Sequence, residues 1–255
     1  MRYFVKLSYC GGDFHGWQRQ ASAYTVQQCL EDHFTTFFRQ KVTFTGAGRT
    51  DTGVHARNYM AHIDLEISDD LPTIIFKLNW FLPKSIVVHD IVPVRPKAHA
   101  RYDAIRRTYQ YYITRSKDPF LHHLAYFYTP VLDLAAMNEA AQYLIGKHDF
   151  RSFARSGTDV NNFICDVQDA FWEEDQQQYV FTITANRFLR NMVRAVVGTL
   201  LEVGRGKLSE NDLPVIMAAG DRRKAATSAP AKGLFLSQID YPDAIFEAPQ
   251  KNLTR

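Results

Sequence analysis

The sequence predicts an α+β fold of two similar lobes, in which antiparallel sheets are flanked by helices. Segments with strand periodicity and segments with helix periodicity are mixed in both halves of the chain, which is typical of α+β proteins. The length of 255 residues also suffices for two small domains. We place the N-terminal lobe at residues 1–98 and the C-terminal lobe at residues 99–255, joined near Pro96 to Ala104.

In the first half, the apolar patterns predict strands and helices in alternation. Thr25 is expected to cap a helix, with Gln28 at the position of a capping box. The alternation from Tyr59 to Ile67 predicts a half-buried strand with His62 on its polar face. Strands are expected at residues 2–9, 41–45, 59–67 and 85–94, and helices at residues 26–38 and 72–81.

The second half repeats this organisation. Asp133 is expected to cap a helix that ends at Gly146, and Ser209 to cap a shorter one. A polar turn around Asp175 is expected to join two paired strands. Strands are expected at residues 108–114, 163–173, 179–185 and 233–240, and a strong helix at residues 190–203.

The composition is that of an ordinary globular protein. Hydrophobic residues make up 46% and charged residues 22% of the chain, which is enough apolar material for a core without metals or disulfides. No stretch approaches the roughly 20 apolar residues of a membrane span, and the N-terminus reads as a strand and not as a signal peptide. We therefore expect a cytoplasmic protein without a membrane partner. The cysteines Cys10, Cys29 and Cys165 are too widely spaced for a zinc site and are expected to be reduced, mostly buried thiols.

Net charge alone does not identify a partner, because it is only +3 with a pI of about 8.7. The arginines nevertheless gather in groups, which are either solvated surface charge or contacts to a polyanion. These groups are Arg101, Arg106 and Arg107; Arg151 and Arg155; Arg187, Arg190 and Arg194; and Arg222 and Arg223.

The segment from Gly46 to Ala56, with the sequence GAGRTDTGVHA, is the most informative part of the chain. A dinucleotide site is disfavoured because a strand, and not a helix N-terminus, follows its glycines. Three glycines within eight residues predict a tight loop. Arg49 and Asp51 at its centre allow two interpretations: an ionised, nucleophilic carboxylate, or an ion pair that stabilises the loop.

This loop resembles the Gly-Arg-Thr-Asp-x-Gly-Val-His signature of the TruA-type tRNA pseudouridine synthases, with Thr52 where that family usually has alanine. Further blocks resemble the same family in order along nearly the whole chain, which makes the resemblance specific. They are residues 9–20 with Gly16-Trp17-Gln18, 99–104, 107–111, 146–153, 191–204, 229–236 and 241–242.

The resemblance implies an isomerase that converts uridine to pseudouridine in the anticodon stem-loop of tRNA, at positions 38, 39 and/or 40. It implies a homodimer with tRNA across both subunits, an active-site cleft between the lobes, and no cofactor or metal. A target base must be flipped into the site, and Asp51 suits attack on the sugar, attack on the base or removal of a sugar proton. The sequence does not distinguish between these three routes.

The resemblance also assigns roles to other residues. Arg49 pairs with Asp51 and acts as a wedge or a phosphate contact during flipping, and Arg194 keeps Asp51 ionised or binds phosphate. Tyr109 stacks on the flipped uracil, and its hydroxyl is a hydrogen-bond partner or proton acceptor. The remaining substrate-binding residues are Arg101, Arg190 and Leu236, and Arg190 and Arg194 are expected on one helix face because they are four residues apart.

Other interpretations of the same residues remain. His55 and His62 could ligate a metal, but ordinary surface histidines are favoured. A non-catalytic RNA-binding protein would not need a carboxylate beside phosphates. A hydrolase that uses Asp51 would need a second acid at about 5 Å if it were a retaining glycosidase, and Asp13 and Asp103 are the candidates for that acid.

Overall fold

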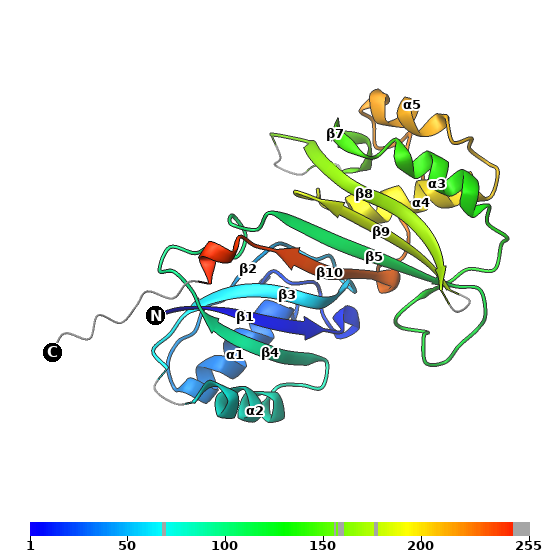
Figure 1. The fold of residues 1–255 in the computed structure, drawn as a ribbon. Coiled ribbons are helices and arrows are strands. Elements are labelled where there is room, and N and C mark those ends of the chain that lie inside the picture. The colour runs from blue at the N-terminus through cyan, green and yellow to red at the C-terminus, as the bar shows by residue number, and fades with distance from the viewer. Residues whose placement is uncertain (68–69, 156, 158–160, 176–177, 247–255) are drawn as a thin grey trace. The chain divides into compact units, whose positions relative to one another are not determined.

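The computed structural model describes residues 1–67, 70–155, 157, 161–175 and 178–246 (Figure 1). The chain divides into two compact units, which are Met1–Ile105 together with the segment from Ser237, and Arg106–Leu236. This division lies seven residues after the boundary expected from the sequence and assigns the closing strand mainly to the first unit. Each unit combines antiparallel strands with helices, so the α+β class is confirmed.

The first unit contains a sheet in the order β4-β1-β3, with the short β2 paired to β3. All of these pairings are antiparallel, and the β1–β3 register places Val5 opposite Ala61. Helix α2 packs against β4, and α1 packs against α2. The elements are β1 (Arg2–Tyr9), η1 (Gly11–Asp13), α1 (Val26–Phe38), β2 (Thr45–Gly46), β3 (His55–Asp64), α2 (Leu71–Phe81), β4 (Ile86–Pro93) and η4 (Asp243–Ile245).

The second unit contains antiparallel strands in the order β5-β9-β8-β7, with β6 added to β5 in parallel. Helix α3 packs against α4 and β8. The elements are β5 (Arg106–Thr114), β6 (Tyr126–Phe127), α3 (Leu134–Gln142), β7 (Gly146–Asp149), η2 (Arg151–Phe153), β8 (Ile164–Asp175), β9 (Gln178–Ala185), α4 (Met192–Gly204), α5 (Asp212–Ala219) and η3 (Ala231–Gly233). Strand β10 (Leu234–Asp240) contributes Leu234 to Leu236 to this unit and its remainder to the first.

Two predicted helix caps are confirmed. The Thr25 side chain accepts the Gln28 N–H at the start of α1, and the Asp133 side chain accepts the Ala136 N–H at the start of α3. Each satisfies a backbone donor that the first helical turn leaves without a partner. The predicted strand pair around Asp175 is also confirmed as β8 and β9, while residues 176–177 of the turn lie outside the described part of the chain.

The three helices of the second unit begin or end at other residues than predicted. Helix α3 ends at Gln142, and Gly146 instead opens β7 with a φ of +103°. Helix α4 begins only at Met192, because Asn191 before it adopts a left-handed φ of +65°. Helix α5 begins at Asp212 with Asn211 as its N-cap, so Ser209 is not the cap, although the Asp212 carboxylate accepts the Ser209 N–H at 2.7 Å as in a capping box.

The strand expected at residues 41–45 is reduced to the two residues of β2. Side chains of α1 supply the hydrogen bonds that a neighbouring strand would otherwise make. The Val42 N–H donates to Thr35 Oγ1 at 3.1 Å, and the N–H of Phe44 donates to Glu31 Oε1 at 3.1 Å. An alternating pattern cannot reveal this exchange, because buried backbone groups require partners without specifying their source.

All three cysteines are free thiols, with Cys29 and Cys165 buried and Cys10 half-buried. Burial raises the pKa of the Cys165 thiol to about 11. Among the described residues, no helix combines the length and apolarity needed to cross a membrane.

Candidate active site

The loop that contains Asp51 leaves β2 and enters β3 in the first unit. The pairing of Gly46 with Ala61 and a hydrogen bond from the Ala47 N–H to Met60 O, at 2.9 Å, hold its first end to β3. Its second end is a turn in which the Val54 N–H donates to Asp51 O at 3.1 Å, with Gly53 at a φ of +78°. Asp51 is half-buried between the buried Thr50 and the exposed Thr52.

Three buried aromatic side chains support this loop. Trp17 and Tyr59 stack with ring centroids 4.0 Å apart, and Tyr9 packs against both. The Tyr59 hydroxyl donates to Gly48 O. Gly46 lies directly on the pair, because a Cβ there would be 2.2 Å from the Tyr59 hydroxyl oxygen and 2.4 Å from Trp17 Nε1. Glycine is therefore required at Gly46 by close packing.

The segment that follows β1 fixes the peptide groups on both sides of Asp51. The Trp17 N–H donates to Thr50 O at 3.3 Å, and the Gly53 N–H donates to Phe14 O at 3.4 Å. The Tyr9 and Thr50 hydroxyls share a hydrogen bond of 2.9 Å. Gly16, at a φ of +82°, permits this approach, since a Cβ there would be 2.4 Å from Thr50 O. The structure thus places a carboxylate on a loop whose backbone is held from two sides, as a preorganised catalytic group requires.

The predicted Arg49–Asp51 ion pair is not formed. Arg49 is exposed, and the described residues show no ion pair between these two side chains. The described contacts therefore do not support an Arg49–Asp51 ion pair as the element that stabilises the loop. The loop is stabilised instead by the backbone and aromatic contacts of Tyr9, Trp17 and Tyr59.

The two histidines near the loop are buried, so the prediction of ordinary surface residues is wrong. Only 1% of His55 and 6% of His62 is exposed. Nδ1 of His55 accepts the Gly11 N–H at 3.0 Å, and Nδ1 of His62 accepts the Ala100 N–H at 3.1 Å. Among the described residues no cluster of histidine, cysteine and acidic side chains could hold a metal.

His62 is buried because a second layer covers the face of β3 that the alternation predicts to be exposed. Ala98 and Ala100 pack with Phe4, Val94 and Ile245 in a small core of the first unit. Burial, followed by the charge of Arg2, lowers the pKa of His62 to about 4. The neutral imidazole can therefore act as the acceptor for Ala100.

Arg101 lies on the segment that covers His62, also in the first unit. The Arg101 side chain is exposed, and its guanidinium lies 5.6 Å from the centroid of the Tyr102 ring. The Arg101 N–H donates to Nδ1 of His99 at 3.1 Å, and the His99 N–H donates to Oδ2 of Asp103 at 2.7 Å. Asp103 thus has a structural role in this turn.

In the second unit, Tyr109 lies on β5 opposite Ile183 of β9. Its ring is half-buried and meets the Phe188 ring edge to face, with centroids 5.0 Å apart. Phe188 was not among the predicted site residues, because nothing in the sequence brings the segment after β9 beside β5. Leu236 lies on β10 and is only 2% exposed, which makes it mainly a packing residue.

Arg194 lies in the first turn of α4 and is held by a neighbouring segment. Its Nε donates to Ala229 O at 2.7 Å, while its own carbonyl accepts the Ala229 N–H at 2.9 Å. Arg190 does not share its helix face, because Arg190 precedes α4 in an exposed turn. The expected pairing of these two arginines on one helix is therefore wrong, and the left-handed Asn191 is the cause.

The segment that holds Arg194, residues 225–230, is named the strap. Arg222 Nη1 donates to Ala225 O at 3.1 Å and to Ala226 O at 3.0 Å, and its Nη2 donates to Ser228 Oγ at 2.9 Å. Asn191 Nδ2 reaches the same Ser228 hydroxyl at 2.7 Å. In the sequence, Arg222 stands only as one of a pair of arginines, so its role in the strap could not be predicted.

The predicted site residues are thus divided between the units. Asp51, Arg49 and Arg101 belong to the first unit, and Tyr109, Arg190, Arg194 and Leu236 belong to the second. The half-buried members of each set, Asp51 in the first and Tyr109 and Arg194 in the second, are fixed by contacts within their own unit.

Comparison with known proteins identifies the class to which this fold and site belong. A family model described as tRNA pseudouridine synthase matches residues 140–242. A tRNA pseudouridine synthase A of Parabacteroides distasonis is 50% identical over 246 residues, which cover 96% of this chain and 98% of that protein. A protein of the same name from Bacteroides fragilis is 50% identical over 248 residues, which cover 96% of this chain and 98% of that protein. Another from Streptococcus suis is 40% identical over 247 residues, which cover 95% of this chain and 99% of that protein. The chain belongs to the tRNA pseudouridine synthase A family.

Proposed function

We propose that the protein isomerises uridine to pseudouridine in the anticodon stem-loop of tRNA, at positions 38, 39 and/or 40, with Asp51 as the nucleophile. Membership of the family makes it an isomerase that acts on uridines in tRNA. The observation that supports the role of Asp51 is the loop around it, in which the peptide groups of Thr50 and Gly53 are both hydrogen-bonded to the segment after β1.

The reaction detaches uracil from its ribose and rejoins it through carbon. The bond from N1 to C1′ breaks, a bond from C5 to C1′ forms, and the hydrogen at C5 leaves while N1 gains one. The balance requires no oxidant and no group donor. A carboxylate can begin this sequence by attack on C1′, by attack on the base or by removal of a sugar proton.

The other residues of the proposed site bind and orient the flipped nucleotide. Tyr109 is expected to stack on the uracil, because an aromatic ring offers an apolar face to a base. Arg194 is expected to keep Asp51 ionised or to bind a phosphate, and Arg49, which is exposed, to act as a wedge during flipping. Arg101 and Arg190, both exposed, would contact the RNA backbone. We expect the protein to be a cytoplasmic homodimer.

The decisive experiment measures tritium release from tRNA transcripts labelled at C5 of uridine. We expect wild type to release tritium. The single-turnover rate of Asp51→Asn should be lower by more than about 1000-fold, while this variant still binds tRNA. Transcripts that retain a single uridine at position 38, 39 or 40 will identify the target.

Asp13→Asn is the matched control, because Asp13 is an exposed carboxylate in the same unit and is the candidate second acid of a hydrolase. It should leave release unchanged. Undiminished release by Asp51→Asn would refute the role of Asp51. Binding by wild type without release from any tRNA would favour a non-catalytic RNA-binding protein.

A further inference from the structure

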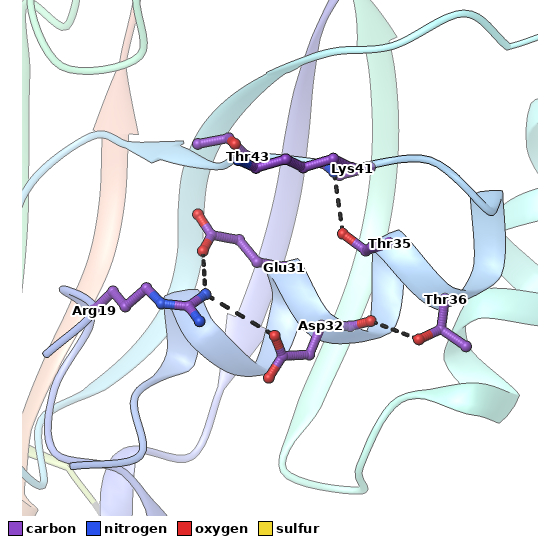
Figure 2. Close-up of a pocket in the computed structure, with 8 residues that line it drawn as sticks. Arg19, Glu31, Asp32, Thr35, Thr36, Lys41 and Thr43 are labelled. Carbon is purple, nitrogen blue, oxygen red and sulfur yellow. Dashed lines mark hydrogen bonds and ion pairs between the residues drawn. The ribbon is translucent and has the colours of Figure 1, made fainter. Parts of the chain in front are cut away.

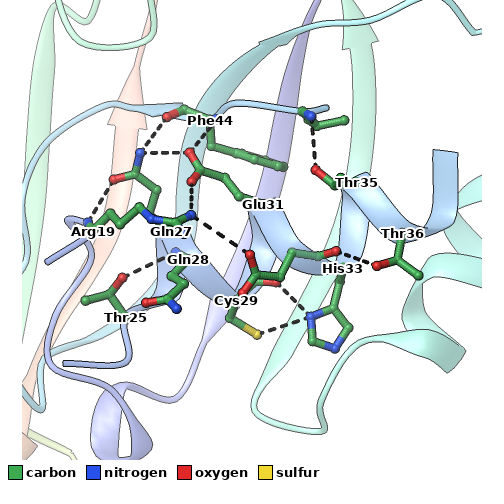
Figure 3. A network of polar contacts seen from close by, with 12 residues as sticks. Arg19, Thr25, Gln27, Gln28, Cys29, Glu31, His33, Thr35, Thr36 and Phe44 are labelled. Carbon is green, nitrogen blue, oxygen red and sulfur yellow. Dashed lines mark hydrogen bonds and ion pairs between the residues drawn. The ribbon is translucent and has the colours of Figure 1, made fainter. Parts of the chain in front are cut away.

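Two polar side chains, Gln27 and Glu31, are buried on α1, and they lie one helical turn apart on the same face (Figure 3). Only 9% of Gln27 and 8% of Glu31 is exposed. A buried carboxylate is costly unless its oxygens accept hydrogen bonds, and a buried amide has a similar requirement. The contacts of these two side chains therefore indicate what they do.

Glu31 uses both carboxylate oxygens. Its Oε1 accepts Nε2 of Gln27 at 3.0 Å and the backbone N–H of Phe44 at 3.1 Å, and its Oε2 accepts Nη1 of Arg19 at 2.8 Å. The carboxylate is thus satisfied within the protein, which argues for a structural task and not for a ligand site.

Gln27 connects two separate parts of the backbone. Its Nε2 donates to Phe44 O at 3.0 Å, and its Oε1 accepts the Arg19 N–H at 3.0 Å. The Gln27 N–H also donates to Trp17 O at 3.0 Å. Together, Gln27 and Glu31 hold both polar groups of the Phe44 backbone and the segment from Trp17 to Arg19. We name this pair the brace.

Both segments held by the brace lead directly to Asp51. Phe44 immediately precedes β2, from which the loop with Asp51 departs. Trp17 donates its N–H to Thr50 O, and Thr50 is the neighbour of Asp51. A shift of either segment would therefore move the peptide on the N-terminal side of Asp51.

We propose that Gln27 and Glu31 are positioning residues of the Asp51 loop, which set the geometry of the nucleophile without touching the substrate. This inference rests on the proposed function. An error of about 1 Å in the placement of a catalytic group is enough to slow a reaction by about 100-fold, so a loosened brace affects the chemical step more than it affects tRNA binding.

Of the brace, Glu31 lines a polar groove of about 360 Å³ (Figure 2). Arg19, Asp32 and Thr35 line this groove together with Lys41, and Arg19 lies 3.9 Å from Asp32. Asp32 is on the same helix as the brace and makes no side-chain contact with Phe44, since Glu31 and Gln27 make those contacts. It is therefore the matched control position.

The test compares Gln27→Glu with Asp32→Asn. Gln27→Glu keeps the size of the side chain, but it places a second carboxylate beside Glu31 and opposite Phe44 O. The two neighbouring carboxylates repel each other, and a proton shared between them relieves the repulsion. At pH 8, with enzyme in saturating excess over tRNA, we expect the single-turnover rate of tritium release to fall at least tenfold. The KM measured under multiple-turnover conditions should stay within twofold of wild type. The ratio to wild type should recover as the pH is lowered to 5.5. Asp32→Asn should remain within twofold throughout.

Amide hydrogen exchange supplies a readout that does not depend on activity. At pH 8, peptides that span residues 14–20 and 44–54 should exchange at least tenfold faster in Gln27→Glu, while peptides of β8 and β9 remain unchanged. Glu31→Gln is the milder variant for use if Gln27→Glu does not fold, and it should show the same pattern with a smaller change.

The outcomes separate the two proposals. Wild-type release with unchanged rate and exchange in Gln27→Glu would overturn the brace and leave the proposed function intact. Failure of wild type to release tritium would refute the proposed function, and the exchange rates would still decide whether the brace holds the loop.

Discussion

At the scale of single residues, the catalytic candidate was easier to predict than its supports. The GAGRTDTG segment contains its glycines and its carboxylate within eight residues, so local sequence alone indicates a constrained loop with chemistry at Asp51. Tyr59 and Trp17 support that loop from other segments. Their pairing could not be predicted, because it depends on how β3 and the turn after β1 meet in three dimensions.

The buried His62 should make the free energy of unfolding depend on pH. Its pKa is about 4 in the folded protein and about 6.5 in an unfolded chain. Because the folded state binds this proton less readily, the contribution is fully present above pH 6.5 and is lost as the pH falls towards 4, by up to about 3 kcal/mol. Urea unfolding between pH 7.5 and 4.5 should show this loss.

His62→Asn is the control for that measurement, because its side-chain oxygen can accept the Ala100 N–H without titrating. Its free energy of unfolding should fall less between pH 6.5 and 4.5 than that of wild type. The pKa of the neighbouring His99 is also lowered, chiefly by burial, so a residual dependence of the same sign is expected. Identical pH dependence in both proteins would contradict the assignment to His62.

At the scale of elements, caps and periodicity were predictable where local chemistry decides them. Thr25 and Asp133 offer side-chain acceptors to helix N-termini and were recognised. The start of α4 was not, because Asn191 adopts a left-handed conformation that its type permits without requiring. The prediction of a strand at residues 41–45 was wrong because side chains of α1, and not a partner strand, bind the backbone there.

Helix α4 packs closely against the strap at Gly198. Gly198 faces the strap so closely that an added Cβ would be 1.9 Å from Thr227 O, a backbone atom. Gly198→Ala should therefore destabilise the protein by about 1–3 kcal/mol, although alanine is the better helix former by about 1 kcal/mol. It should also slow tritium release, because Ala229 in the strap holds Arg194.

Chemical unfolding and single-turnover release measure the two effects of Gly198→Ala. Gly12→Ala is the matched control, because a Cβ at Gly12 would meet nothing within 4 Å. Its unfolding midpoint should stay close to that of wild type. An unchanged or raised midpoint in Gly198→Ala would show that the strap yields easily and does not fix Arg194.

At the scale of the whole molecule, the fold class was predictable and the exact division of the chain was not. Strand and helix periodicity in both halves indicates α+β units, and each unit has this character. The assignment of the segment from Ser237 to the first unit depends on long-range contacts. Tyr241 donates its hydroxyl hydrogen to Ala100 O, and Ile245 packs with Phe4. These contacts leave no trace in local periodicity.

The affinity of the protein for tRNA should depend on salt concentration. With a net charge of only +3, affinity for tRNA must come from local groups of arginines, and it should fall as salt rises because each phosphate contact releases counterions. Arg190→Gln should weaken binding and reduce the slope of log affinity against log salt by about one.

Filter binding across a series of KCl concentrations measures that slope. Arg223→Gln is the comparison, because the Arg223 guanidinium is engaged by Asp221 at 2.8 Å, and it should change the slope less than Arg190→Gln does. Equal slopes for Arg190→Gln and wild type would exclude Arg190 from the phosphate contacts.

The return of the segment from Ser237 to the first unit has a consequence for synthesis on the ribosome. The chain emerges from its N-terminus, and domains generally fold in the order of their emergence. Here the small core around Phe4 lacks Tyr241 and Ile245 until residues 237–246 have been translated. The residues of the second unit are all available earlier. The half that begins the chain is therefore the later one to complete its core, and Phe4 stays partly uncovered during most of translation.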